Sequence, residues 1–549
     1  MPRGEPTHFE FKGGLNMSSR PELSTGEALV GLLEAYGVDT IFGIPGVHNV
    51  EMYRALPRSK IKHVLVRHEQ GAGFMADGYA RATGKPGVCF TITGPGLLNI
   101  LTPMGQAWSD SSNMLVIASA LDMADSAQGR GRLHEMIDQR AAAASVTNLH
   151  MRAYTPKDVR DGLARAFSNF SSQRPRPAYL EIPLDMLKIA AGDGWHIRPL
   201  PRRALPQADQ IAAVVARLNA AKRPIIILGG GALDCGKAAL SIAEKLNAPV
   251  ITTTAGKGSI PEDHPLCLGY RLGRRPAVDF IRSADAILCA GSQLSETDFW
   301  QDNVVIDKNL IRIDIDADSL AQPHTAEIAI QADAKATLEA IEQGLNVHGA
   351  QAKSNIGGSE RDYIRDVVSD TKQQIILKVL EVIRASLPRE TIVCSDMTQI
   401  AYVANEAFPV YEPHTWIHPV GFGTLGFSLP AGIGAKFGKP ETPVAVLIGD
   451  YGLQYTLNEL GTAAEHKLPI IILVWNNESL GAIHDNMVNF GIQPNAVNLK
   501  NPDFQMLARA YGCNAEKPSS LRALASAIKA ALKAEGPTLI EMTPAMVNG

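Results

Sequence analysis

Short apolar runs that alternate with longer amphipathic segments are the feature of this chain that most constrains its fold. Runs such as Met114–Ser119, Ala286–Gly291 and Val444–Asp450 have the length and composition of buried strands. Their alternation with helical patterns is typical of βα units that build parallel sheets. We therefore predict an α/β fold made of doubly wound domains with parallel sheets.

The chain is long enough for several domains. At 549 residues it exceeds what one hydrophobic core usually supports. A Pro- and Arg-rich stretch at Trp195–Pro206 and a Gly- and Ser-containing stretch at His348–Asp362 have the composition of linkers. We predict a flexible tail and three α/β domains, over residues 1–22, 23–190, 205–348 and 370–549.

Composition and charge exclude several classes of protein. Apolar residues make up 45% of the chain, charged residues 20%, and the net charge is -4, which indicates a globular protein that does not bind nucleic acid. No apolar run reaches the roughly 18 residues of a membrane span, and the first residues lack the apolar core of a signal peptide. The six cysteines show no CxxC spacing, which favours free thiols over a zinc site. We expect a cytoplasmic protein without a membrane partner.

The strongest local signal lies in the segment Gly449–Ser479. Asp450 directly follows one predicted strand, and Asn476 and Asn477 follow the next, with a helix between them. In a right-handed βαβ unit both strand ends lie at the same edge of the sheet, where ligands bind. Carboxylate, amide and carbonyl oxygens are ligands that Mg²⁺ prefers, so we predict a metal site made by Asp450, Asn477 and the carbonyl of Ser479. The alternative is that Asp450 caps the helix and the asparagines form a turn.

A second signal lies in the segment Val66–Asn99. Glu69 begins a Gly- and Ala-rich helix that can pack closely against a neighbour, and Gly94–Gly96 ends the following strand in a tight turn. By itself, Glu69 is most simply a favourable negative charge in the first turn of a helix. A functional role for Glu69 depends on the motifs that accompany it.

Together with Gly421–Lys436, these two segments resemble the thiamine-diphosphate enzymes of the acetolactate synthase and pyruvate decarboxylase superfamily. The resemblance runs from about Ser24 to Thr543, with the motifs in the same order and the weakest match in the middle block. It implies a pyrimidine-binding, a central and a diphosphate-binding domain, with thiamine diphosphate and Mg²⁺ as cofactors. In that family the first domain of one subunit and the third of another form the site, which implies a homodimer or homotetramer.

The resemblance also implies catalytic roles. Glu69 would hydrogen-bond the aminopyrimidine ring and help move a proton there. Gly423 would offer its carbonyl to the amino group of that ring, and Leu425 would hold the cofactor bent, unless Leu425 is ordinary core. His68 and His134 fall where relatives line the substrate pocket, although single histidines are more often structural or exposed.

Further residues are expected near the cofactor or the substrate. Asp396, Thr398 and Gln399 follow a predicted strand and are expected near the diphosphate, with a simple turn as the alternative. Glu135 and the loop Gly43–Asn49 fall where relatives line the substrate pocket. The residues expected to bind the cofactor are Gly43, Pro45, Gly94, Pro95, Asn99, Asp396, Thr398, Gln399, Gly449, Tyr451 and Gly452.

The central block departs from the flavin-dependent members of the superfamily. Anabolic acetolactate synthases hold FAD with arginines in a segment like ARFDDR, but in the corresponding stretch Gly291–Trp300 both arginines are replaced, by Gln293 and Thr297. FAD is therefore not expected. The Gly-rich Gly229–Gly236 follows a strand but does not fit GxGxxG, so we interpret it as a loop at a sheet edge.

The motifs favour decarboxylation of a small 2-oxo acid through a cofactor-bound carbanion, with release of CO₂ and an aldehyde. An acetolactate synthase-like carboligase is the alternative, and a non-catalytic relative is a third reading. In detail the motifs are most similar to 5-guanidino-2-oxopentanoate (2-ketoarginine) decarboxylases. A substrate guanidinium would need an acidic partner in its pocket, for which Glu135, Asp138 and Asp485 are candidates.

Overall fold

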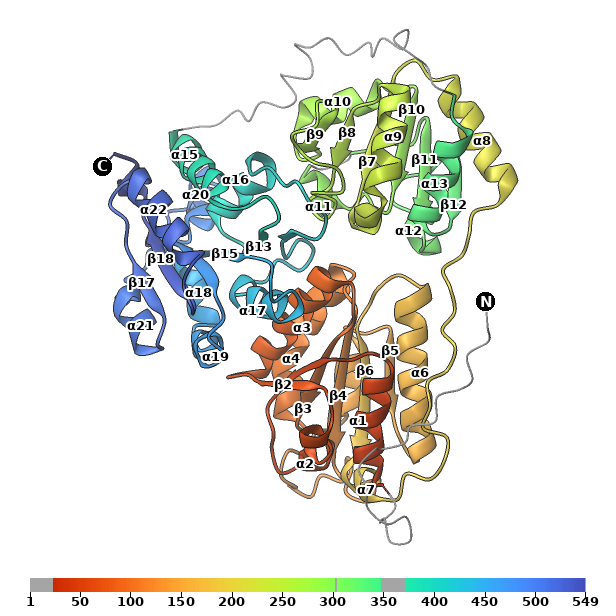
Figure 1. Cartoon of the computed structure of the whole chain (residues 1–549), viewed down its shortest axis with the longest axis vertical. Coiled ribbons are helices and arrows are strands. Elements are labelled where there is room, and N and C mark those ends of the chain that lie inside the picture. Colours follow the sequence, from red (N-terminus) through yellow and green to blue (C-terminus); the bar gives the residue numbers. More distant parts are fainter. Residues whose placement is uncertain (1–22, 302–303, 347–370, 549) are drawn as a thin grey trace.

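The computed structural model describes residues 23–301, 304–346 and 371–548, and within them the chain forms three parallel sheets of six strands each (Figure 1). The expected tail over residues 1–22 lies outside the described residues, as does the whole of the expected linker at His348–Asp362. The prediction of an α/β fold with doubly wound parallel sheets is confirmed.

The first sheet has the strand order β2-β1-β3-β4-β6-β5, with every pairing parallel. Its strands are β1 (Thr40–Gly43), β2 (Lys62–Leu65), β3 (Gly87–Thr91), β4 (Met114–Ala120), β5 (Leu149–Arg152) and β6 (Ala178–Pro183). Its helices are α1 (Thr25–Ala35), α2 (Val50–Tyr53), α3 (Glu69–Thr83), α4 (Pro95–Ser109), α5 (Gln139–Ala144), α6 (Pro156–Ser172) and α7 (Leu184–Lys188), with a 3₁₀ turn η1 (Leu56–Arg58). Val116 and Ile117 enter different hydrophobic cores, because successive strand side chains point to opposite faces of a sheet.

The central sheet has the order β12-β11-β10-β7-β8-β9, the order of doubly wound dinucleotide-binding folds. Its strands are β7 (Pro224–Leu228), β8 (Val250–Thr252), β9 (Cys267–Tyr270), β10 (Ala286–Ala290), β11 (Leu310–Asp314) and β12 (Ile328–Gln331). Its helices are α8 (Ala208–Asn219), α9 (Gly236–Leu246), α10 (Arg275–Arg282), α11 (Glu296–Phe299), α12 (Ala317–Ala321) and α13 (Ala334–Gly344), with η2 (Gly230–Cys235). The loops after β7 and β10 touch where the strand order reverses, since a Cβ on Gly231 would lie 2.9 Å from Gly291 Cα.

The third sheet has the order β14-β13-β15-β16-β18-β17. Its strands are β13 (Ile392–Ser395), β14 (Trp416–Ile417), β15 (Val444–Gly449), β16 (Ile470–Trp475), β17 (Asn514–Glu516) and β18 (Thr538–Met542). Its helices are α15 (Thr371–Ser386), α16 (Gln399–Ala407), α17 (Ser428–Gly438), α18 (Asp450–Tyr455), α19 (Glu459–Glu465), α20 (Gly481–Asn489), α21 (Phe504–Ala510) and α22 (Leu521–Ala531), with η3 (Pro544–Asn548). Two short helices, α18 and α19, therefore connect β15 to β16, where one helix was expected.

The first and third domains share one hydrophobic core, which α3 and α17 build side by side (Figure 1). The two helices approach closely because each presents glycine to the other. A Cβ on Gly78 would lie 2.0 Å from the carbonyl oxygen of Ala431, and one on Gly434 would lie 1.9 Å from that of Met75. The small residues predicted to allow close packing of the Glu69 helix do so here.

Replacing Gly78 with alanine is expected to lower the stability of the fold by about 1–3 kcal/mol, since the added methyl has no space between the two backbones. Thermal unfolding of the purified variant measures this. Gly31→Ala in α1 is the matched control, because a Cβ there meets nothing within 4 Å and alanine favours a helix. An unchanged unfolding temperature in Gly78→Ala would contradict the close packing.

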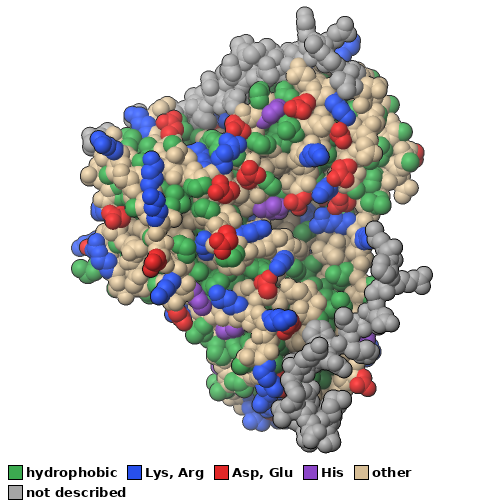
Figure 2. All heavy atoms as spheres, in the orientation of Figure 1, with side chains coloured by type: hydrophobic (Ala, Val, Ile, Leu, Met, Phe, Trp, Pro, Cys, Tyr) green, Lys and Arg blue, Asp and Glu red, His purple; other side chains and the backbone are tan. Residues whose placement is uncertain are grey.

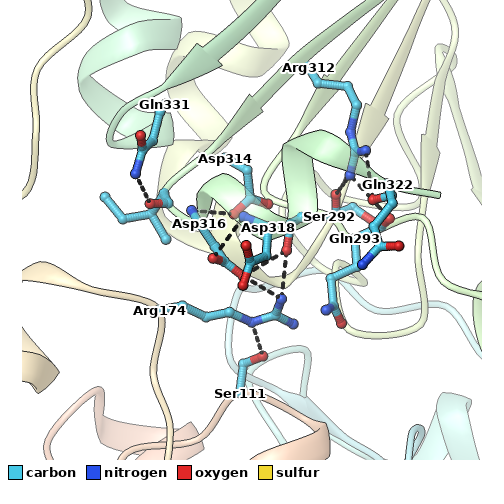
Figure 3. A network of polar contacts seen from close by, with 12 residues as sticks. Ser111, Arg174, Ser292, Gln293, Arg312, Asp314, Asp316, Asp318, Gln322 and Gln331 are labelled. Carbon is cyan, nitrogen blue, oxygen red and sulfur yellow. Dashed lines mark hydrogen bonds and ion pairs between the residues drawn. The ribbon is translucent and has the colours of Figure 1, made fainter. Parts of the chain in front are cut away.

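A polar network joins the first and central domains (Figure 3). Arg174, which follows α6, donates through Nε to Ser111 Oγ at 2.9 Å and through Nη1 to Ser319 Oγ at 2.7 Å, and it pairs with Asp316. In the central domain, the buried Arg312 of strand β11 donates to four backbone carbonyls, those of Ser292, Gln293, Gln322 and His324. The stretch in which flavin-binding arginines are replaced is thus held from within its own domain.

Three other sequence predictions meet the structure directly. The tight turn expected at Gly94–Gly96 extends only to Gly94, which lies in a turn after β3 with a φ of 67°, because Pro95 and Gly96 already belong to α4, whose first position suits proline. The six cysteines are all free and buried. Among the helices in the described part of the chain, none is long and apolar enough to cross a membrane. Both charge signs are scattered over the face in Figure 2.

Candidate active site

The predicted metal ligands meet at the carboxyl edge of the third sheet. Asp450 follows β15 and is 2% exposed, and its Oδ2 accepts the backbone N–H of Glu478 at 2.9 Å, so the carboxylate spans the ends of β15 and β16. Asn477 follows β16 and donates to Gln399 Oε1 at 2.9 Å, which brings the end of β13 into the same group. Ser479 lies beside them, and its backbone N–H donates to Asn477 Oδ1 at 3.3 Å.

Two asparagines determine how the carboxylate of Asp450 is held. Asn501 donates to Asp450 Oδ2 at 2.7 Å and to Asn476 Oδ1 at 2.9 Å. Asn476 is buried and donates in turn to Glu541 at 2.8 Å, so it belongs to the framework behind the edge, whereas Asn477 lies at the edge itself. Sequence reasoning missed Asn501, because no local pattern marks a polar residue that reaches Asp450 from 51 positions away.

Glycines let the backbone approach this group. A Cβ on Gly449 would lie 2.7 Å from Thr398 Oγ1, and one on Gly452 would lie 3.2 Å from Asp396 Oδ1. Tyr451 lies between them, with its ring against that of Tyr455. The two glycines therefore bring the backbone of this segment close to Thr398 and Asp396.

Asp396 holds the loop that carries Gly423 and Leu425. It is fully buried and accepts the backbone N–H groups of Gly426 at 3.1 Å and Ser428 at 3.0 Å. Burial raises the pKa of this carboxyl, while these hydrogen bonds act in the opposite direction. Gly423 has a φ of 65°, which favours glycine, and Leu425 stays partly exposed, unlike a core leucine.

Glu69 lies buried at the start of α3, next to the start of α4. Its Oε2 accepts a hydrogen bond from Asn99 Nδ2 at 2.9 Å, whereas its Oε1 has no partner among the described residues. A Cβ on Gly96 would lie 3.4 Å from that Oε1. One carboxylate oxygen is thus oriented by Asn99 and the other is left for a ligand beside a backbone without a side chain.

The third domain holds the segment that precedes Glu69. Glu459 of α19 is fully buried and accepts the backbone N–H groups of Arg67 and His68, each at 3.1 Å. Burial raises the pKa of Glu459 to about 7, with hydrogen bonds from Thr462 and these amides opposing the rise. Sequence reasoning missed Glu459; the only local signal is a carboxyl beside Leu460, at a core-facing helical position.

The two predicted histidines have different surroundings. His68 is exposed and caps α3, because its Nδ1 accepts the N–H of Gln70 at 3.1 Å. His134 has a φ of 65°, and its ring meets that of His48 edge to face at 4.8 Å. His134 also lines a cavity of about 180 Å³ at the carboxyl end of β4. The backbone carbonyl of His134 lies close to Gly94, where an added Cβ would be 2.6 Å from the carbonyl oxygen.

The acidic residues considered for a substrate cation are largely engaged. Glu135 accepts three backbone N–H groups of its own loop, from Gly129 to Arg132. Asp138 caps α5 through Oδ1 and lines the 180 Å³ cavity. Asp485 pairs with Lys372 at 2.9 Å and accepts from Gln399, which places it near Asn477.

The remaining predicted residues lie in the first domain. Gly43 is the last residue of β1, where a Cβ would lie 2.3 Å from the carbonyl oxygen of Phe90, and Pro45 follows in the loop toward His48. The first-domain residues expected to bind the cofactor thus all follow β1 or β3 at one edge of the sheet.

The fold and this arrangement define a class of enzyme. Family models of thiamine pyrophosphate enzymes match all three parts: the N-terminal binding domain over residues 23–142, the central domain over 211–341 and the C-terminal binding domain over 396–542. The chain therefore belongs to the thiamine pyrophosphate enzymes and depends on that cofactor.

Individual relatives agree. The chain is 45% identical over 534 residues to the probable 2-ketoarginine decarboxylase AruI of Pseudomonas aeruginosa. The match covers 96% of this chain and 95% of that protein. It is 30% identical to a probable acetolactate synthase large subunit of Methanococcus aeolicus, over 94% of this chain and 91% of that one. A solved structure from Mycobacterium smegmatis, of a proposed thiamin diphosphate-dependent enzyme, matches with a TM-score of 0.81 at 23% identity, over 95% of this chain and 99% of that one.

Proposed function

We propose that this protein decarboxylates a small 2-oxo acid with thiamine diphosphate and Mg²⁺, releasing CO₂ and the corresponding aldehyde. The observation that carries this is the 45% identity to a probable 2-ketoarginine decarboxylase along nearly the whole chain. The geometry supports it, since a buried carboxyl with an open oxygen, at Glu69, and an oxygen-rich sheet edge, at Asp450 and Asn477, are both present.

The residues fit the two cofactors. Asp450, Asn477 and the carbonyl of Ser479 offer only oxygen, which suits Mg²⁺ bound to a diphosphate. Gly449 and Gly452 let the backbone beside them pack closely against Thr398 and Asp396. When bound, thiamine diphosphate supplies an electron-accepting thiazolium ring for the loss of CO₂.

The protein's own groups would orient the aminopyrimidine ring of the cofactor and move its protons. Glu69 would bind the aminopyrimidine through its open Oε1, while Asn99 keeps the carboxylate turned toward the ligand. The carbonyl of Gly423 would accept a hydrogen bond from the amino group of the aminopyrimidine. Leu425 would hold the cofactor bent. His134, whose ring meets that of His48, lines the cavity in which we place the substrate.

We further propose that a second copy of this chain completes the site. Large apolar side chains remain exposed around the cofactor loop and α4: Leu98 is 50% exposed, Phe422 53% and Tyr455 49%. Phe422 lies against Gly105 of α4 and Tyr455 lies beside Gly426, so these two flank the loop, while Leu98 lies on α4 itself. A homodimer or homotetramer would bury this region.

A panel of 2-oxo acids tests the proposed reaction. With thiamine diphosphate and Mg²⁺, 5-guanidino-2-oxopentanoate and related acids should give CO₂ and aldehyde in equal amounts, measured by mass spectrometry. An acetolactate synthase-like carboligase, which the 30% identical relatives favour, would instead give CO₂ and a ligated 2-hydroxy-ketone. Absence of CO₂ from every acid of the panel would contradict both reactions. We expect neither to require FAD, since Gln293 and Thr297 replace the flavin-binding arginines.

A further inference from the structure

The loop that carries Gly423 is bound by a helix of another domain. Gln106 of α4 accepts from Thr424 through a single oxygen, Oε1, at 3.1 Å from the backbone N–H and 2.5 Å from Oγ1. Asp110, one turn further along, accepts the backbone N–H groups of Val420 at 3.1 Å and Gly421 at 2.8 Å. The first domain therefore fixes both sides of Gly423, which belongs to the third domain.

The two side chains act as one unit. Gln106 Nε2 donates to Asp110 Oδ2 at 2.7 Å, so the amide and the carboxylate orient each other. Arg81 of α3 pairs with Asp110 at 3.3 Å and donates to the carbonyl of His418 at 2.9 Å, which supplies a charge partner for the carboxylate. Gln106 is fully buried, and a buried amide that loses its partners is costly.

Two glycines also let α4 and the loop pack closely against each other. A Cβ on Gly105 would lie 2.8 Å from the ring of Phe422, and one on Gly421 would lie 2.1 Å from Ser109 Oγ. The third domain holds the same loop at Gly426, where Asp396 accepts the backbone N–H and the hydroxyl of Thr456 donates to the backbone carbonyl. The position of the Gly423 carbonyl thus depends on α4 on one side and on Asp396 on the other.

Helix α4 also reaches the other cofactor-contacting group of its own chain. Asn99, which orients Glu69, lies seven residues before Gln106 on this helix, about 10 Å along its axis. One helix therefore contacts both the carboxyl that is to bind one aminopyrimidine and, because two subunits are proposed to form each site, the loop that is to accept from the amino group of another.

We propose that Gln106 and Asp110 are positioning residues that hold the loop Val420–Leu425 in the geometry needed to bind the aminopyrimidine of thiamine diphosphate. The proposal rests on the cofactor contact of Gly423 in the proposed function. Neither residue touches the cofactor or the substrate; each acts through the backbone of residues 420–424.

Cofactor affinity is the decisive measurement, because it does not require that the substrate be known. In Gln106→Ala, the dissociation constant of thiamine diphosphate at saturating Mg²⁺, measured by calorimetric titration, should rise about 10-fold. With any accepted 2-oxo acid, kcat should fall by a similar factor while KM stays unchanged. Gln173→Ala is the matched control, since Gln173 is exposed at the end of α6 and its side chain makes no bond to a cofactor-contacting segment among the described residues.

A rescue variant separates positioning from simple destabilisation. Gln106→Glu keeps an acceptor for Thr424 but places a second carboxylate beside Asp110, so it should bind the cofactor poorly. Adding Asp110→Asn lets the new amide donate to the carboxylate at position 106 and still accept from Gly421, although Val420 loses its acceptor, so the double variant should recover part of the affinity. Thr424→Val, which removes only the hydroxyl donor, covers the case in which Gln106→Ala does not fold and should weaken binding about threefold.

Two results would overturn the proposal. One is cofactor binding within twofold of the unmodified protein in Gln106→Ala, or in Thr424→Val if the former does not fold. The other is a loss of affinity that the double variant does not recover, which would mean that the helix only stabilises the domain interface. If no 2-oxo acid releases CO₂ but the affinity pattern holds, the proposed reaction fails while the positioning role stands.

Discussion

Replacing Glu69 with glutamine is expected to lower kcat for CO₂ release by about 10²–10⁴-fold, the usual contribution of a positioned acid–base group. The amide nearly matches the carboxyl in size, so the fold and the contact with Asn99 should persist. The loss should therefore appear in turnover, with thiamine diphosphate still bound. Steady-state kinetics, together with exchange of the cofactor's reactive C–H with deuterated water, measure the effect.

Glu465→Gln is the matched control for this change. Glu465 ends α19 and forms an exposed ion pair with Arg67, so the same substitution there alters a surface contact of little energetic value. Turnover in this control should stay within twofold of the unmodified protein. If Glu69→Gln retained normal turnover and normal exchange, the role assigned to Glu69 would be wrong.

Replacing Asp450 with asparagine is expected to weaken binding of Mg²⁺ and thiamine diphosphate by about 100-fold, at the upper end of what loss of a residue supporting a metal site costs. The substitution removes the negative charge from the edge where β15 and β16 end. Removing the metal with a chelator should have the same effect on the unmodified protein, and added Mg²⁺ should reverse it. Titration of each cofactor in the presence of the other measures the affinities.

Asp209→Asn in α8 makes the same chemical change at an exposed position of the central domain and should leave both affinities unchanged. If Asp450→Asn bound Mg²⁺ and the cofactor normally, Asp450 would only link the two strand ends through Glu478 and Asn501. Asp450 would then have only a structural role, as it also would in the helix-cap and turn alternative considered from the sequence.

Sequence reasoning performed best where strands are buried on both sides. The runs that became β4, β10 and β15 are continuous and apolar because both faces of a doubly wound sheet are covered. The edge strands β2 and β17 escaped prediction, since they are half solvated and have no such run. Two short helices replaced the one expected after Asp450, and Pro95 and Gly96 belong to a helix where the expected turn was to continue.

The approximate location of the site was predictable from local order along the chain. In a parallel sheet, a residue directly after a strand lies at the carboxyl edge whatever the rest of the protein does, so Asp450 and Asn477 could be paired from spacing alone. The spacing alone does not show which of Asn476 and Asn477 lies at the sheet edge and which belongs to the framework behind it. That distinction came from the bond of Asn476 to Glu541.

The sequence by itself determined the class of fold, the edge at which the cofactor is expected and Asp450 and Asn477 as candidates, because each follows from short-range pattern, while Glu69 became a candidate through the family resemblance of its segment. Only the tertiary structure decided which residues orient them: Asn99, Asn501, Glu459, Gln106 and Asp110. All of these contacts join segments tens to hundreds of positions apart, and three of them, those of Glu459, Gln106 and Asp110, cross between domains. Their geometry is set by how α3, α4 and α17 pack in the shared core, a long-range property that no local pattern encodes.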